Sequence, residues 1–400
     1  MYPQVCFHIM ASEPVEVLFA GERSRVLLCR GADDEPSLLK ISRLSHTNRA
    51  AAERARREVN LCLQSLGGFV VSSQGWLRVG DELCVRLDYM PGGDLDLLLD
   101  RQGSLAPHAA RFYCGCAALG LQALHERAIL HRDVKPDNIA IGGDGYAKLV
   151  DLGFGIGLES PGGRATTMLG TPEFLSPEAF QGMGQTASSD MYALGVTLYV
   201  LLLSSHPYAA CDNPQDLYRL VLSEPPFFPC NIISDAARAL ISACMQRDEA
   251  SRPRAEELWR LAFFAGPPAP LSLEKAPLLR EAVSNRSHPP PFLPRLHDGP
   301  FDTFYFEEAA GSSDDDSSDD GHHVSKDAED INTRMAVLAV QHPGGETTAA
   351  VASGSRRERA AARKKAHRNR ELHLASGAAV LSQYHTAPCE SVEELLAGQP

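Results

Sequence analysis

The sequence predicts an α+β fold in two lobes, in which a small, mainly β lobe precedes a larger, mainly helical lobe. In residues 12–88 short apolar runs alternate with turn residues, a pattern typical of strands. In residues 89–266 longer helix-forming stretches dominate. Prolines accumulate in residues 267–308, and residues 309–400 are polar with an acidic low-complexity run. We therefore expect two folded lobes, a proline-rich tail and a largely disordered tail.

The small lobe is expected to contain five strands and one helix. The helix is expected from about Arg49 to Leu66, because this stretch is rich in helix formers and is followed by Gly67-Gly68. The strands are expected at residues 15–19, 25–29, 37–41, 75–79 and 83–87. In the large lobe, the apolar run Met191–Leu203 is too short to span a bilayer comfortably, so it predicts a buried core helix.

The composition excludes several classes of protein. With 38 basic and 51 acidic residues the chain has a net charge of −13, which does not favour general nucleic-acid binding. A hydrophobic content of 44% supports a sizeable core. The ten cysteines form no CxxC pair, so we expect free thiols in a reducing compartment. Without a signal-peptide pattern or a membrane span, a cytoplasmic or nuclear protein with no membrane partner is expected.

Three polar motifs in the large lobe carry the functional signal. They are HRDVKPDN at 131–138, LVDLG at 149–153 and GTPEFLSPE at 170–178. In this order and spacing they resemble the catalytic loop, the metal-binding loop and the end of the activation segment of eukaryotic protein kinases. The resemblance implies the bilobal kinase fold, ATP and Mg²⁺ as cofactors, and protein substrates. The form Lys-Pro-Asp-Asn is typical of serine/threonine kinases.

The same resemblance assigns roles to individual residues. It implies that Asp133 orients the substrate hydroxyl and that Lys135 neutralises the transferred phosphate. Asn138 and Asp151 would hold magnesium, which needs few protein ligands when phosphates and water supply the others. Upstream, Lys40 would hold the ATP phosphates and pair with Glu58. Glu53 is a competitor for that pairing, but it lies off the helix face that carries Leu61.

The nucleotide site shows a departure from the family pattern. In the register set by Lys40, the pattern GxGxxGxV retains only Gly21 and Val26, which should change the flexibility of the loop that covers the phosphates. In the adenine pocket, the large and small residues of the family are exchanged, with Leu38 above and Ala140 below, a volume-conserving swap. The remaining nucleotide-site residues that the resemblance implies are Leu87 at the rear of the pocket, Asp88 to Met90 at the hinge, and Asp94.

Further matches extend the resemblance beyond the three motifs. Asp190–Gly195 resembles the start of the buried central helix, and Arg252 matches the arginine that pairs with Glu178. Leu258–Phe264 is similar to the closing helix of AGC-type kinases, the group of the cAMP-dependent kinase. Residues 290–294 and 301–304 are similar to the C-terminal tail of that group, although a proline-rich linker with aromatics is the alternative. No aromatic hydrophobic motif follows Glu308.

Two rivals to an active protein kinase stay open at this point. The degenerate glycine loop favours a pseudokinase scaffold that binds partners with little phosphotransfer. A small-molecule kinase of related fold is disfavoured by the motif at 170–178, which resembles a peptide-docking segment.

Two further features concern regulation and targeting. Thr167 is expected to be a phosphosite held by Arg132, with Thr166 as its rival. Residues 356–370 carry eight positive charges and predict contact with a nuclear import receptor, or a solvated helix without a receptor. The sequence disfavours nucleic-acid binding there, because no aromatic residues interleave the basic ones.

Overall fold

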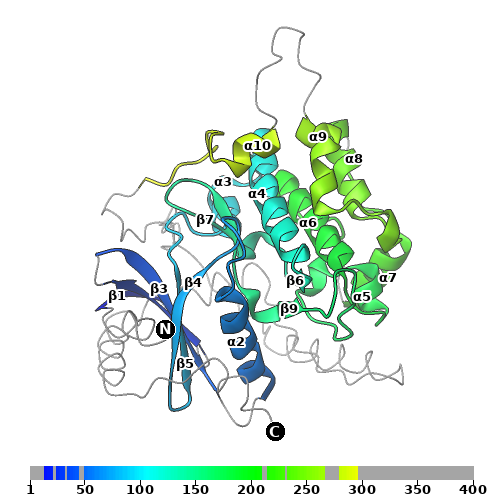
Figure 1. Cartoon of the computed structure of the whole chain (residues 1–400). Coiled ribbons are helices and arrows are strands. Elements are labelled where there is room, and N and C mark those ends of the chain that lie inside the picture. Colours follow the sequence, from blue (N-terminus) through cyan, green and yellow to red (C-terminus); the bar gives the residue numbers. More distant parts are fainter. Residues whose placement is uncertain are drawn as a thin grey trace, which may run out of the picture.

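The computed structural model describes residues 13–20, 24–31, 34–44, 49–209, 214–229, 232–265 and 279–295. The described part has the two lobes that the sequence predicts (Figure 1). Gly21, the 301–304 motif, the acidic run and the basic segment 356–370 lie outside the described residues.

The small lobe is a five-stranded antiparallel sheet in the order β1-β2-β3-β5-β4, with one helix, α2, packed on one face. Each strand covers the expected segment with one to two further residues at most ends, since alternating apolar residues mark the centre of a strand better than its limits. The bounds are β1 Glu13–Ala20, β2 Ser24–Arg30, β3 Pro36–Arg43, β4 Ser73–Val79, β5 Glu82–Asp88 and α2 Arg49–Cys62.

Helix α2 ends earlier than the sequence predicts, at Cys62 instead of Leu66. The amide of Gln64 donates to the carbonyl of Leu61 at 3.0 Å, a tightened last turn, and Gly67 adopts φ 94°. The chain leaves the helix here and turns toward the large lobe. There the amide of Val71 donates to the carbonyl of Leu149 at 2.8 Å.

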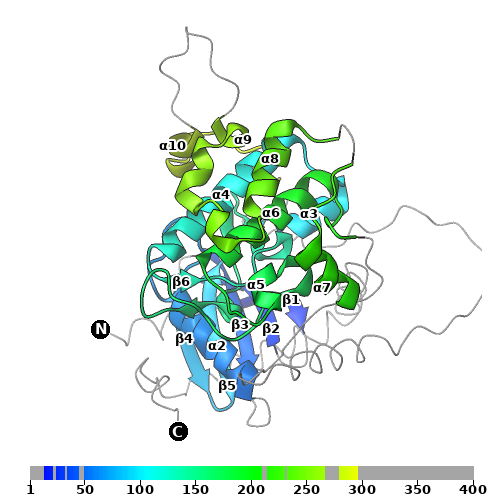
Figure 2. The same cartoon turned by 90° about the vertical axis from the view of Figure 1, so that its right-hand side faces the viewer.

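The large lobe is mainly helical, and its other helices lie around helix α6, Ala187–Leu203 (Figure 2). The side chains of α6 are buried on nearly every face of the helix. This burial confirms the core helix predicted around Met191–Leu203. No helix within the described ranges is long and apolar enough to cross a membrane. The α-helices are α3 Leu95–Gln102, α4 Pro107–His125, α5 Pro177–Phe180, α6 Ala187–Leu203, α7 Pro214–Ser223, α8 Asp235–Cys244, α9 Ala262–Ala265 and α10 Leu279–Ser284.

Short strands and 3₁₀ turns between the lobes carry the motifs. The strands are β6 Ile129–Leu130, β7 Ile139–Ile141, β8 Ala147–Leu149 and β9 Ile156–Gly157. The 3₁₀ turns are η1 Pro136–Asn138, η2 Leu152–Phe154, η3 Pro172–Phe174, η4 Glu249–Ser251 and η5 Ala255–Arg260. Strand β6 pairs with β9 and strand β7 pairs with β8, so the segments around 131–138 and 149–157 are held side by side.

The residues after α10 pack against the large lobe and reach the link between α2 and β4. Arg286 donates through Nη2 to the carbonyl of Gly68 at 3.1 Å and forms an ion pair with Asp144 through Nη1. Its guanidinium lies 5.1 Å from the ring centroid of Tyr146, whose hydroxyl donates to the carbonyl of His288. This part of the proline-rich tail therefore contacts both lobes.

Candidate active site

The carboxylate of Asp133 is held by four neighbouring groups. Its Oδ1 accepts from the backbone amide of Thr171 at 2.9 Å and from the Thr171 hydroxyl at 2.7 Å. Its Oδ2 accepts from the Asn138 amide at 2.8 Å and lies 2.9 Å from Lys135 Nζ. Lys135 Nζ also donates to the Thr171 hydroxyl at 2.6 Å. Asp133 is thus preorganised in a polar network at the end of β6.

Asp190, near the start of α6, anchors the backbone of the loop at 131–138. Asp190 Oδ2 accepts from the amide of His131 at 3.0 Å, and Oδ1 accepts from the amide of Arg132 at 2.8 Å. Oδ2 also lies 2.9 Å from His125 Nε2. Burial alone would raise the pKa of Asp190, but these hydrogen bonds outweigh it and hold the pKa below its usual value.

The anchoring role of Asp190 was not found from the sequence, where this residue only matched a helix-start pattern. The available signal was an acidic residue directly before a long apolar run, because a buried carboxylate needs partners. Arg132, which it helps to hold, has a left-handed backbone with φ 66°.

Lys40 on β3 pairs with Glu58 on α2, and not with the competing Glu53. The Nζ of Lys40 lies 2.6 Å from Oε1 and 2.8 Å from Oε2 of Glu58, and 3.4 Å from Oδ1 of Asp151. Glu53 instead contacts Arg57 on the same helix at 3.0 Å. Helix α2 is therefore held against the sheet by an ion pair that reaches the motif at 149–153.

The electrostatics of this cluster favour its ionised lysine. Burial would lower the pKa of Lys40, but the carboxylates of Asp151 and Glu58 outweigh burial and raise the pKa above its ordinary value. For Asp151, attraction by Lys40 is the largest cause and lowers the pKa to about 2. Burial raises the pKa of Glu58, and Lys40 opposes that rise. Asp151 is thus a charged carboxylate that remains available as a hard oxygen ligand.

The oxygen donors present suit a magnesium ion shared with phosphate groups. Asp151 adopts a left-handed backbone, with φ 58° and ψ 70°, and its side chain accepts from the amide of Gly153. Asn138 donates through Nδ2 to the carbonyl and to Oδ2 of Asp133, so its Oδ1 is the oxygen with which it would bind a cation. Among the described residues no cluster of three or more histidine, cysteine or acidic side chains could hold a metal. This donor set fits an ion that takes one or two protein ligands and completes its shell with phosphate and water.

The described residues that are expected to line a nucleotide pocket lie on β2, β3, β5 and β7 and in the segment after β5. Val26 on β2 is paired with Lys40 on β3, and Leu38 is paired with Leu87 on β5. Ala140 on β7 is 7% exposed and Met90 is 4% exposed, so both are buried apolar residues.

The two acidic residues proposed for this site have structural contacts of their own. Asp88 forms an ion pair with Lys148 at 2.7 Å and accepts from the hydroxyl of Ser72. Asp94 caps α3, since its Oδ1 accepts from the amide of Leu97 at 2.8 Å.

Arg132, in the loop at 131–138, contacts the segments around Phe154 and Thr167. Its Nη1 donates to the Thr167 hydroxyl at 2.9 Å, and its Nε donates to the carbonyl of Phe154 at 2.7 Å. Its Nη2 is buried and has no hydrogen-bond partner among the described residues. Burial is the main cause that lowers the pKa of Arg132 to about 10, and the positive charge of Arg57 adds to it.

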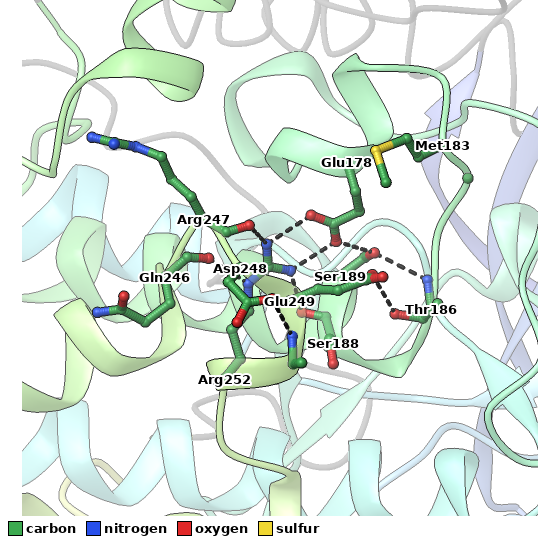
Figure 3. Close-up of polar contacts among 12 residues, drawn as sticks. Glu178, Met183, Thr186, Ser188, Ser189, Gln246, Arg247, Asp248, Glu249 and Arg252 are labelled. Carbon is green, nitrogen blue, oxygen red and sulfur yellow. Dashed lines mark hydrogen bonds and ion pairs between the residues drawn. The ribbon is translucent and has the colours of Figure 1, made fainter.

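The end of the activation segment is fixed by a buried ion pair (Figure 3). Arg252 makes two contacts of 2.7 Å to the two carboxylate oxygens of Glu178, and Ser189 donates to Oε1 at 2.6 Å. Arg252 also donates to the carbonyls of Gln246 and Ser188. Every charge in this pair has several partners, which is the condition under which a buried ion pair is tolerated.

Comparison with known proteins agrees with this geometry. Residues 13–264 match the family model described as "Protein kinase domain". The chain is 32% identical over 246 residues to serine/threonine-protein kinase N3 of Mus musculus, covering 60% of this chain and 26% of that protein. It is 30% identical over 204 residues to cAMP-dependent protein kinase catalytic subunit 3 of Drosophila melanogaster, covering 50% of this chain and 34% of that protein.

A third relative shares a longer segment. Ribosomal protein S6 kinase alpha-1 of Rattus norvegicus is 28% identical over 304 residues, covering 74% of this chain and 40% of that protein. The chain thus spans between about a quarter and two fifths of the length of these relatives. Their names agree with the resemblance to AGC-type serine/threonine kinases. With a family model that covers well over half of its residues, the chain belongs to the protein kinase domain family, and AGC-group kinases are among its distant relatives.

Proposed function

We propose that this protein is an active serine/threonine protein kinase that transfers the γ-phosphoryl group of ATP to hydroxyl groups of protein substrates. The observation that carries the proposal is the complete set of charge-handling residues in contact with one another. Lys40 contacts Glu58 and Asp151, while Asp133 contacts Lys135 and Asn138. Phosphoryl transfer depends on positioning and charge neutralisation, which is what this arrangement supplies.

Each residue has a distinct role in the proposed reaction. Asp133, fixed by Thr171 and Asn138, accepts a hydrogen bond from the substrate hydroxyl and takes its proton as the substrate oxygen bonds to the γ-phosphorus and the bond from that phosphorus to the leaving oxygen of ADP breaks. Lys135 stabilises negative charge on the group in transfer, and Lys40 orients the nucleotide phosphates. Bound Mg²⁺-ATP would supply the phosphoryl group and further charge neutralisation, with Asn138 and Asp151 as the protein ligands of the metal.

The second candidate is a pseudokinase scaffold, and the glycine loop favours it. Only Gly21 and Val26 match the family pattern there, and fewer glycines restrict the approach of backbone to phosphate. No residue that handles charge is lost, however, and the Lys40–Glu58 pair is formed. Turnover of ATP therefore separates the two candidates.

The test is magnesium-dependent phosphorylation of a protein substrate by the purified full chain. We expect that Lys40→Ala and Asp133→Ala each lower turnover at least about a hundredfold, the scale for removing a positioned catalytic group. Asp151→Asn should abolish the magnesium dependence together with activity. Glu53→Ala is the matched control, since Glu53 is an exposed acid on α2 that contacts only Arg57 in the described residues. Near-normal phosphorylation by Asp133→Ala, with contaminating kinase excluded, would refute the proposal.

Substrate preference is proposed to lean weakly toward basic residues. Asp94 and Asp137 lie at positions where relatives that prefer basic substrates carry acidic residues. Ion pairs between these acids and substrate arginines would increase affinity and fix the position of the substrate along the site. Val200 replaces a further acid of those relatives, so one arginine contact is missing. A peptide library that selects acidic residues before the acceptor would contradict this preference.

We also propose that residues 356–370 contact a nuclear import receptor. The eight positive charges in this segment are distributed so that a helix would be charged on every face and could not pack into a core. Deletion of these residues in the tagged full chain should shift the protein from the nucleus to the cytoplasm. An unchanged nuclear signal after deletion, or a wild-type chain that never enters the nucleus, would exclude targeting by this segment.

A further inference from the structure

The small-lobe sheet has an apolar cluster on the face that points away from α2. Side chains alternate across a strand, so residues two apart share a face. The cluster takes alternate residues of neighbouring strands and is separate from the main core of the protein. We call it the outer cluster, and its members are Leu27, Cys29, Leu39, Ile41, Leu77 and Cys84, with Val17 and Val79 packed against them.

The opposite face of the same sheet is covered by helix α2. Lys40, which lies between Leu39 and Ile41 in sequence, points to that face and reaches Glu58 on α2. Val85 and Trp76 on that face belong to the main core together with Val59 of α2. Figure 1 shows α2 on one side of the sheet and no described helix or strand on the other side.

The outer cluster is nevertheless shielded from solvent. Its six members are between 0% and 2% exposed, although the described neighbours of the cluster all belong to the sheet itself. Ser37 and Arg86, which are joined by a 2.9 Å hydrogen bond, are also buried at 0% and 5% exposed. An open sheet face would leave leucine and isoleucine side chains in water, so this face requires a covering layer from outside the described residues.

We propose that residues 1–12 of the same chain pack across the outer cluster and complete the small lobe. This segment leads directly into β1, an edge strand of the sheet. Eight of its twelve residues are hydrophobic, and it contains no lysine, arginine, aspartate or glutamate. Twelve extended residues reach about 40 Å, whereas five strands span about 20 Å from edge to edge. Its attachment to β1 gives it a high effective concentration at this face.

Other occupants are less consistent with these observations. The tail beyond residue 295 carries an acidic run at 314–320 and the basic segment 356–370, and it joins the protein on the large lobe. A second copy of the chain would bury the cluster only after association. The segment before β1 is the apolar, uncharged stretch that lies next to this face in sequence, and the proposal does not depend on kinase activity.

Photo-crosslinking in the intact chain tests the proposal directly. A benzophenone amino acid placed at Phe7 should crosslink within the monomer to peptides from residues 24–43 or 73–88. The same group placed at Tyr384 is the control and should give no crosslink to these strands. Crosslinks from Tyr384 but not from Phe7 to the sheet would identify the tail as the cover, and crosslinked dimers would identify a second copy. Either result overturns the proposal.

Deletion provides an independent measurement. Removing residues 1–12 should lower the melting temperature by at least about 5 °C and increase the binding of a hydrophobic dye, because several apolar side chains become exposed. Removing residues 301–400 should change neither. Should the first deletion prevent folding, Phe7→Ser and Ile9→Ser in the full chain should show a smaller loss in the same direction. Unchanged melting temperatures for these variants and for the first deletion would contradict the proposal.

Discussion

The imidazole of His206 donates through Nε2 to the backbone carbonyl of Glu173, in the segment that follows Thr171. Its Nδ1 accepts from the amide of Tyr208 at 3.3 Å, so one neutral tautomer satisfies both contacts. The ring meets Phe174 edge to face, with centroids 5.9 Å apart at 76°. Burial is the main cause that lowers the pKa of His206 to about 4, although the bond to Glu173 opposes it. The loop after α6 thereby supports the segment that holds Asp133.

This contact predicts a dependence of stability on pH. His206 is neutral in the folded protein above its pKa of about 4, while in the unfolded chain it takes up a proton below its ordinary value of 6.5. The unfolded state therefore binds more protons between these values, and stability falls as the pH falls through that window. Relative to His206→Gln, the wild type should lose about 2 kcal/mol more unfolding free energy between pH 7.5 and pH 5. Denaturant titrations at both pH values measure this, and equal losses would contradict the prediction.

Removing the negative charge of Glu58 should lower the turnover rate of the enzyme. Glu58→Gln keeps the size of the side chain but leaves Lys40 paired only with Asp151 at 3.4 Å. We expect turnover to fall by about tenfold to a hundredfold, since Lys40 loses the group that orients it. The matched control is Glu53→Gln, which lies on the same helix and should keep wild-type turnover. Steady-state kinetics with varied ATP measure both variants, and equal activity of the two would argue against a role for the pair.

The buried Glu178–Arg252 ion pair should contribute more to the stability of the large lobe than an exposed ion pair does. Arg252→Ala leaves the Glu178 carboxylate buried without its charged partner, which costs about 3–5 kcal/mol. Arg254→Ala is the control two residues away, because Arg254 is 71% exposed in its pairs with Glu256 and Glu257. Such exposed pairs add little to stability, because solvent screens the attraction between the charges. Chemical denaturation should show a much larger loss of unfolding free energy for Arg252→Ala than for Arg254→Ala. A similar loss in both variants would refute the stabilising role of the Glu178–Arg252 pair.

Phosphorylation of Thr167 should increase activity through Arg132. The Thr167 hydroxyl lies 2.9 Å from Arg132 Nη1 and the residue is exposed, so a kinase can reach it. A phosphate there would add nearly two negative charges beside a buried guanidinium, one of whose nitrogens has no hydrogen-bond partner among the described residues. Thr167→Ala should lower turnover about tenfold in protein from cells, while Thr166→Ala should not. Mass spectrometry that finds both threonines unmodified in fully active protein would exclude this regulation.

The sequence alone was sufficient for the fold class, the strand positions and the order of the motifs, because these depend on local patterns. Alternation of apolar residues marked the sheet, and the spacing within HRDVKPDN placed Asp133, Lys135 and Asn138 on one short loop. The pairing of Lys40 with Glu58 was also expected, because the resemblance to protein kinases implies it and Glu53 lies off the helix face that carries Leu61. The predicted end of α2 was less accurate, since helix-forming residues continue in the sequence past Cys62, where the helix ends.

Only the tertiary structure decided which distant residues support the site. Asp190 holds the amides of His131 and Arg132 from 59 and 58 residues away, and His206 holds the carbonyl of Glu173 across 33 residues. No local pattern encodes such contacts, because they form only when packing brings separate elements together and excludes water from their polar groups. The buried outer cluster is of the same kind. Its alternating residues were visible in the sequence, but their burial away from α2 was set by the folded sheet.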